Sequence, residues 1–293
     1  MKRILLPTDF SENAENAVHY ALQLYENETC EFHLLHTYTP TAYYSDSMFN
    51  NYPNLEMEEE LKLHARRELR KFTRKLAQNY KNPRHTFKVH VSFNLLILEM
   101  SFMLQEHNFE MVIMGTKGAT GAKEIFLGTN TMYAIKKLKC PVLAVPSDYK
   151  FKEPKQILFA TDFRLKKDYK YLHLIKSLCQ SHDSLLHILN AFDSSPLNEE
   201  QLDIKDYLNY YFENPHRFHL AEGTEVVSAV REFERKNNIH LLTMIHNKHN
   251  FFENLLFKSA ISQLVYHIEL PFLVLPSVVK PAKEKHQTKY KIL

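Results

Sequence analysis

Residues 3–11 read RILLPTDFS, and residues 156–164 read QILFATDFR. In both segments an apolar run is followed by Thr, Asp and Phe. Two further segments return in the same order: CEFHLLHTY (30–38) as DSLLHILNAF (183–192), and CPVLAVPS (140–147) as LPFLVLPS (270–277). Repetition over this distance predicts that the chain is a tandem duplication of one domain.

The length of the chain agrees with this prediction, because 293 residues is about twice the usual size of a single domain. We expect a first domain at 1–148 and a second, more diverged domain at 154–279. The polar stretch DYKFKE (148–153) joins them, and a basic tail follows at 280–293.

Within each repeat, short aliphatic and β-branched runs alternate with longer amphipathic segments, which predicts an α/β fold with a parallel sheet. In the first repeat we expect strands at 3–8, 31–38, 86–91, 111–115 and 142–146, and helices at 12–26, 56–80, 95–107 and 129–138. In the second repeat we expect strands at 156–161, 184–191, 216–221, 240–245 and 272–275, and helices at 165–180, 198–211, 225–237 and 255–268.

Composition narrows the possible partners and compartments. The 37 basic and 34 acidic residues nearly balance, which argues against a nucleic-acid surface. The cysteines Cys30, Cys140 and Cys179 lie far apart with no metal-binding spacing, which is typical of a reducing compartment. Since no apolar run approaches the roughly 20 residues that cross a bilayer, we expect a cytoplasmic protein that binds neither membrane nor nucleic acid.

The stretch GTKGATGAKEIFLGTNT (115–131) holds four of the five glycines in the chain. It follows an expected strand and ends at an expected helix, at the edge of a parallel sheet where ligands bind. Without a Cβ, Gly115 and Gly118 let the backbone approach a bulky anion. Gly128 precedes a helix N-terminus, which favours phosphate, and Lys117 could neutralise its charge. The stretch therefore predicts a phosphate site.

Spacing excludes two common phosphate loops. A Walker loop needs a glycine five residues after Gly115, where Thr120 stands, and the dinucleotide pattern G-x-G-x-x-G is absent. The remaining pattern, G-x2-G-x9-G-T, resembles the nucleotide-binding signature of the universal stress protein family. The segments LLPTDFS (5–11) and CPVLAVP (140–146) are similar to that family as well, and the resemblance extends over both repeats.

The resemblance implies two tandem Rossmann-like domains of the adenine-nucleotide α-hydrolase type, each with a five-stranded parallel sheet of order 3-2-1-4-5 flanked by helices. It also implies a bound adenine nucleotide, which would be ATP, ADP or AMP, with Mg²⁺ or Mn²⁺. Adenosine would contact the ends of the first two strands, and the glycine stretch would hold the phosphates. The implied binding residues are Pro7, Thr8, Asp9, Thr37, Met114, Gly115, Lys117, Gly118, Gly128, Thr129, Asn130 and Thr131.

The second repeat lacks the glycine pattern. Its corresponding segment, IHNKHNFFENLLFKSAIS (245–262), has no glycine, and His246 and His249 replace the first two. Because side chains would fill the phosphate space, we expect no ATP in this repeat. We expect it instead to form an intramolecular pseudo-dimer with the first repeat through 142–146 and 272–275, which leaves a further homodimer open. His246 and His249, with His240 nearby, suggest a metal site, but the segment HNKH lacks a convincing third ligand, so we expect no metal there.

Three functions fit these features. The protein could be a nucleotide-responsive stress regulator, a slow ATP hydrolase or phosphotransferase, or an interaction scaffold with a vestigial glycine stretch. Hydrolysis needs a base near the γ-phosphate, and no residue of the first repeat stands out as one. The pattern is intact in one repeat and lost in the other, so the fold does not require it. We therefore favour the regulator and lean against an enzyme.

Overall fold

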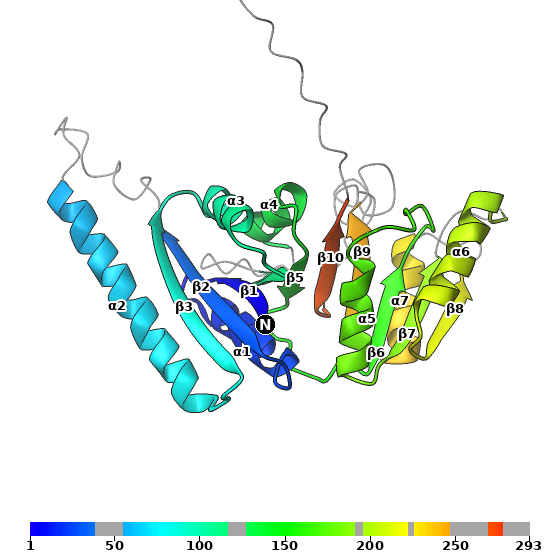
Figure 1. Ribbon diagram of the computed structural model, residues 1–293, viewed down its shortest axis with the longest axis horizontal. Coiled ribbons are helices and arrows are strands. Elements are labelled where there is room, and N and C mark those ends of the chain that lie inside the picture. Colours follow the sequence, from blue (N-terminus) through cyan, green and yellow to red (C-terminus); the bar gives the residue numbers. More distant parts are fainter. Residues whose placement is uncertain (39–54, 117–126, 191–195, 222–225, 247–268, 278–293) are drawn as a thin grey trace, which may run out of the picture.

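The computed structural model describes residues 1–38, 55–116, 127–190, 196–221, 226–246 and 269–277. In these residues the strands form one ten-stranded sheet of order β3-β2-β1-β4-β5-β10-β9-β6-β7-β8. Figure 1 shows the first repeat on the left and the second on the right, with β5 and β10 between them.

The first repeat supplies the half of the sheet with the order β3-β2-β1-β4-β5, in which every pairing is parallel. This is the order 3-2-1-4-5 expected from the sequence, and the expected α/β class is confirmed. Its strands are β1 (Lys2–Pro7), β2 (Cys30–Tyr38), β3 (His85–Phe93), β4 (Met111–Gly115) and β5 (Val142–Val145), and its helices are α1 (Glu12–Leu24), α2 (Leu55–Asn79), α3 (Leu96–Glu106) and α4 (Thr129–Lys137).

The second repeat has the same strand order when its strands are counted from β6. Its strands are β6 (Gln156–Ala160), β7 (Leu185–Asn190), β8 (His216–Leu220), β9 (Leu241–His246) and β10 (Phe272–Pro276), and its helices are α5 (Leu172–Ser181), α6 (Glu199–Tyr211) and α7 (Val226–Asn237). The helix expected at 255–268 lies outside the described residues. Most of the other expected bounds agree closely with these.

The helix expected at 165–180 begins instead at Leu172, and two tyrosines explain the difference. The Tyr169 hydroxyl donates to the carbonyl oxygen of Pro276 at 2.7 Å, and the Tyr171 hydroxyl donates to that of Lys139 at 2.8 Å. Both side chains are buried. Each hydroxyl thus bonds a residue distant in the chain, which holds 169–171 outside the regular helix.

Alternation along the strands divides the core between the two faces of the sheet. On β1, Ile4 and Leu6 belong to an apolar cluster that includes residues of α1, α2, α5 and α6. Leu5 lies on the opposite face, whose apolar cluster includes residues of α3, α4 and α7. The sheet is thus covered on both sides (Figure 1). None of the described helices is both long enough and apolar enough to cross a membrane.

The two halves of the sheet join where β10 pairs antiparallel with β5, with Leu273 opposite Leu143 and Val274 opposite Val142. These four side chains are almost completely buried. The pairing covers two strand edges that would otherwise be exposed. Further contacts tie the halves together, since the ammonium group of Lys2 donates to the hydroxyl oxygen of Ser177 at 3.0 Å.

Candidate functional site

A tight turn follows β1 at the carboxyl edge of the sheet. The backbone N–H of Phe10 donates to Thr8 Oγ1 at 3.1 Å, and that of Ser11 donates to Asp9 Oδ1 at 3.0 Å. Phe10 has a φ of 63°. The Ser11 hydroxyl also donates to Asp9 Oδ1 at 2.6 Å and accepts from the Ala14 N–H, which caps α1 as expected. The turn leaves Asp9 exposed between β1 and α1.

The second repeat makes the same turn after β6. The N–H of Phe163 donates to Thr161 Oγ1 at 3.1 Å, that of Arg164 donates to Asp162 Oδ1 at 3.0 Å, and Phe163 has a φ of 54°. The surroundings differ, however. Asp162 is 7% exposed and Phe163 only 1%, whereas Phe10 is 38% exposed. The Thr-Asp-Phe segment is therefore a structural turn in both repeats, but its aspartate is exposed only in the first.

An aromatic group lies beside the first turn. His36 Nδ1 contacts the carbonyl oxygen of Thr8 at 2.8 Å. The His36 ring lies 4.5 Å from that of Phe10, which in turn contacts the edge of Phe72. The sequence prediction named Thr37 and overlooked His36. A comparison of the two repeats could have pointed to this position. At the end of the repeated strand, the second repeat has Asn190, which is buried, in place of His36.

Three of the predicted binding residues lie on one face of the sheet. Pro7 is two residues after Leu5 and Thr37 is two residues after Leu35, so both point to the side covered by α3 and α4. Met114 belongs to the apolar cluster on that side and is buried, as is Pro7, whereas Thr37 is partly exposed. The structure thus brings Pro7, Thr37 and Met114 together on this face, near the ends of three neighbouring strands.

Gly115 has a packing role of its own at the end of β4. A Cβ on this residue would lie 2.7 Å from Asn13 Cγ, closer than real side chains approach. Asn13 is a buried residue in the first turn of α1. The absence of a side chain at Gly115 therefore allows α1 to lie close to the end of β4.

The described ends of the glycine stretch are fastened to each other. The N–H of Gly128 donates to the carbonyl oxygen of Thr116, and the buried Thr131 hydroxyl donates to that of Gly115 at 2.7 Å. Lys117 and Gly118 lie between these points, outside the described residues. These bonds hold the start of α4 against the end of β4.

The start of α4 presents polar groups to solvent. Gly128 is its N-cap and has no side chain to bond the first-turn N–H groups. Thr129 and Asn130 are exposed in that first turn, whereas Thr131 is buried. Unpaired N–H groups with the positive end of the helix dipole suit an anion. The residues present at the start of α4 therefore fit a phosphate group, and Asp9 is exposed at the same edge of the sheet, after the neighbouring strand β1.

The histidines named in the sequence analysis do not gather at one point. His240 precedes β9, where its Nδ1 accepts from the Gln156 N–H at 3.2 Å, and His246 ends that strand. His249 lies outside the described residues. Six positions along a strand separate the first two by about 20 Å. Within the described part of the chain, no three His, Cys, Asp or Glu side chains form a group that could hold a metal.

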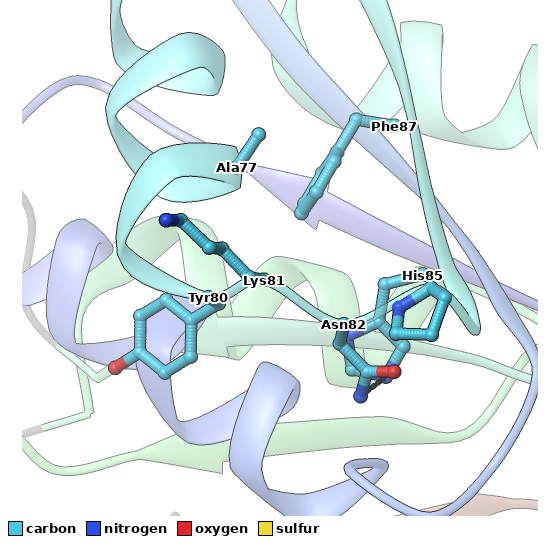
Figure 2. Close-up of a pocket in the computed structure, with 7 residues that line it drawn as sticks. Ala77, Tyr80, Lys81, Asn82, His85 and Phe87 are labelled. Carbon is cyan, nitrogen blue, oxygen red and sulfur yellow. Dashed lines mark hydrogen bonds between the residues drawn. The ribbon is translucent and has the colours of Figure 1, made fainter.

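A shallow pocket of about 410 Å³ lies at the opposite edge of the first repeat, between the end of α2 and the start of β3. Figure 2 shows Tyr80, Asn82, His85 and Phe87 around it. The Nε2–H of His85 donates to the carbonyl oxygen of Tyr25 at 2.9 Å. None of the predicted binding residues lines this pocket.

Comparisons with known proteins agree with the architecture. The sequence model described as the universal stress protein family matches residues 1–146. A universal stress protein of Methanocaldococcus jannaschii is 29% identical over 152 residues, which are 49% of this chain and 94% of that protein. The crystal structure of a universal stress protein from Archaeoglobus fulgidus matches with a TM-score of 0.64 at 17% identity, over 94% of this chain and 96% of that chain. At that identity the structural match shows the shared fold alone.

Proposed function

Because residues 1–146 belong to the universal stress protein family, we propose that the first repeat binds an adenine nucleotide, ATP foremost, and that the protein is a nucleotide-responsive stress regulator. The observation that supports this proposal is a difference between the two repeats at the carboxyl edge of the sheet. The first repeat has Asp9 exposed at the edge of the sheet where α4 begins, whereas the second buries Asp162 in the same turn.

The adenosine would lie at the ends of β1, β2 and β4. Pro7 and Thr37 offer an apolar ring and a methyl group on the face where Met114 packs. The exposed Asp9 carboxylate can accept hydrogen bonds from hydroxyl or amino groups of the ligand. These residues would orient the adenosine half of the nucleotide.

The phosphates would lie at the start of α4. The first-turn N–H groups and the exposed Thr129 and Asn130 side chains would donate to phosphate oxygens. Lys117 and Gly118, in the glycine stretch, would add positive charge and close backbone approach. Mg²⁺ or Mn²⁺ would share the phosphate charge. Thr131 would act indirectly, because its hydroxyl already holds α4 to Gly115.

The second repeat would serve as the structural partner in an intramolecular pseudo-dimer. Phe163 and Tyr169 are buried around the end of β6 and β10, where Tyr169 is bonded to Pro276. His246 ends β9 as a buried residue. Among the described residues, the turn after β6 is thus covered by side chains, whereas Asp9 and Phe10 are exposed in the turn after β1. This arrangement supports one nucleotide per chain, with a further homodimer left open.

Regulation fits the described residues better than turnover. At the start of α4 they supply hydroxyl, amide and backbone groups, which bind phosphate and are weak bases. We also propose a cytoplasmic location. Cys30, Cys140 and Cys179 are free and buried, and burial raises the pKa of each thiol to about 12, which agrees with a reducing compartment.

Mass spectrometry of the ligand released from freshly purified protein tests the proposal. We expect ATP or ADP at one molecule or fewer per chain, followed by retention of added ATP with negligible release of ADP in Mg²⁺. Steady magnesium-dependent ADP formation would favour a slow hydrolase. Absence of nucleotide, with no binding at millimolar ATP, would refute the proposal and favour a scaffold.

A further inference from the structure

Each repeat contains a pair of hydrogen-bonded imidazoles between its second and third strands. His33 Nδ1 lies 3.0 Å from His90 Nε2, and His187 Nδ1 lies 3.0 Å from His219 Nε2. In both repeats the pairing is the same. The histidine of the third strand lies directly across the sheet from the residue that follows the histidine of the second strand by two positions. His33 and His187 are buried. The duplication has therefore preserved this pair in two repeats that differ widely elsewhere.

The bonding of each pair fixes its protons. His33 Nε2 contacts a carboxylate oxygen of Glu31 at 2.8 Å, and His187 Nε2 contacts Gln156 Oε1 at the same distance. Both oxygens only accept, so Nε2 of the first imidazole carries the hydrogen and its Nδ1 accepts from the second imidazole. A proton added at that Nδ1 would place two N–H groups face to face. Protonation of the first imidazole therefore breaks the bonding seen here unless the second imidazole moves its own hydrogen to Nδ1.

Charges around the first pair include a carboxylate. The hydrogen bond from His33 holds the pKa of Glu31 at about 2, so Glu31 is ionised. Arg3 of β1 and Lys88 of β3 also contact it, at 3.3 and 3.1 Å. His107, after α3, lies 5.9 Å from the His33 ring, and Glu99 of α3 acts on His90. An imidazolium at His33 would therefore face a negative partner.

The second pair has no such compensation among the described residues around it. Its acceptor on β6 is the neutral amide of Gln156, and Arg217 of β8 is the charged neighbour acting on both imidazoles. From α7, the Phe233 ring packs 4.6 Å from His219 and 5.3 Å from His187. A proton on this pair would face an amide, a cation and an aromatic ring.

From this geometry we infer that the two imidazole pairs are an acid-sensitive device, which releases the outer strands β3 and β8 on mild acidification, with β8 and α7 opening first. In the open state each imidazole returns to a pKa of about 6.5. In the closed state burial lowers the pKa of His90 and of His187 to about 4, and also lowers that of His33 and His219.

The sign of the effect follows from this difference. Above pH 6.5 both states are neutral and the closed state keeps its full stability. Between pH 6.5 and 4 the imidazoles bind protons in the open state but not in the closed state. The free energy of closing therefore becomes less favourable as the pH falls. The loss should be greater for the second pair, since only the first has a carboxylate that accommodates the charge.

Reciprocal substitutions test the inference. Hydrogen exchange of the full-length protein, corrected for intrinsic rates, would be followed by mass spectrometry from pH 7 to pH 4. In the wild type we expect protection of β8 and α7 to fall at least tenfold more than that of β3 and α3. Gln156→Glu should reduce the loss in β8, and Glu31→Gln should enlarge it in β3. Glu232→Gln, at an exposed carboxylate of α7, is the control and should change neither.

Protection independent of pH in the wild type, or equal responses of both repeats to either substitution, would overturn the inference. Nitrogen-15 shifts of the wild-type imidazoles give a second measurement that needs no variant. We expect His33 and His187 to be neutral and protonated at Nε2 at pH 6. Ordinary titration of His187 and His219 near pH 6.5 in the folded protein would also overturn it.

Discussion

Asp9 and Asp162 accept the same backbone hydrogen bond, at 3.0 Å, from the residue two positions later, yet Asp9 is exposed and Asp162 is buried. The Thr-Asp-Phe turn is thus part of the fold in both repeats. Its availability to a ligand depends on what packs around it. In the second repeat Phe163 and Gln201 cover the turn, and the Gln201 side chain donates to the carbonyl oxygen of Asp162 at 3.0 Å.

Gly115→Ala should destabilise the fold. The added Cβ would lie 2.7 Å from Asn13 Cγ, so the buried Asn13 side chain, α1 or the end of β4 must move. Overpacking of this kind costs about 1–3 kcal/mol, measurable by urea unfolding. Asn13→Ala in the same chain should recover part of the loss. A variant as stable as the wild type would contradict the tight packing of the Asn13 side chain against Gly115.

Substitutions at Thr131 and Thr129 should have different effects, the first on stability and the second on ATP binding. Thr131→Val removes the buried hydrogen bond to Gly115 and should cost about 1–2 kcal/mol of unfolding free energy. Thr129→Val, at an exposed position, should leave stability nearly unchanged and weaken ATP binding. Calorimetry and urea unfolding of both variants check this. The reverse assignment of the two effects would contradict the described start of α4.

Tyr169→Phe should weaken the segment that precedes α5. The variant keeps the ring but leaves the carbonyl oxygen of Pro276 without the 2.7 Å hydrogen bond, at a cost of about 1–2 kcal/mol. Thermal unfolding measures the change. Tyr210→Phe is the matched control, since Tyr210 is 87% exposed. Equal melting temperatures for the two variants would show that the Tyr169 hydroxyl contributes nothing.

The three thiols should resist alkylation in the folded protein. Burial raises the pKa of Cys30, Cys140 and Cys179 to about 12, so at pH 8 each remains a protonated thiol without access to solvent. Iodoacetamide with peptide mass spectrometry should label them slowly without denaturant and fully in urea. Rapid labelling of one cysteine in the folded protein would place it outside the core.

The repeat and the alternation of strand and helix patterns were enough to predict a duplicated α/β fold, because both are local patterns that occur twice in the chain, whereas the strand order came from the family resemblance. The start of α5 was not predictable in this way. Tyr169 and Tyr171 leave the helical pattern to bond Pro276 and Lys139, which are distant in sequence. Bonds of that kind are formed by the tertiary structure and leave no local signal.

The same limit applies to the candidate site. The glycine spacing indicated a phosphate site, but the contact of Gly115 with Asn13 joins residues far apart in the chain. His36 was overlooked because its partner is a backbone carbonyl, that of Thr8, which any sequence supplies. The exposure of Asp9 and the burial of Asp162 could not be read from two nearly identical segments, since distant side chains decide both.

Calorimetric titration of ATP into Asp9→Ala and Asp162→Ala tests the central claim most directly. Both substitutions remove the same backbone hydrogen bond, and Asp9→Ala also removes the bond from the Ser11 hydroxyl. We predict at least a tenfold loss of ATP affinity in Asp9→Ala, and wild-type affinity at one site per chain in Asp162→Ala. Equal affinities in the two variants, or loss of binding only in Asp162→Ala, would contradict nucleotide binding by the first repeat.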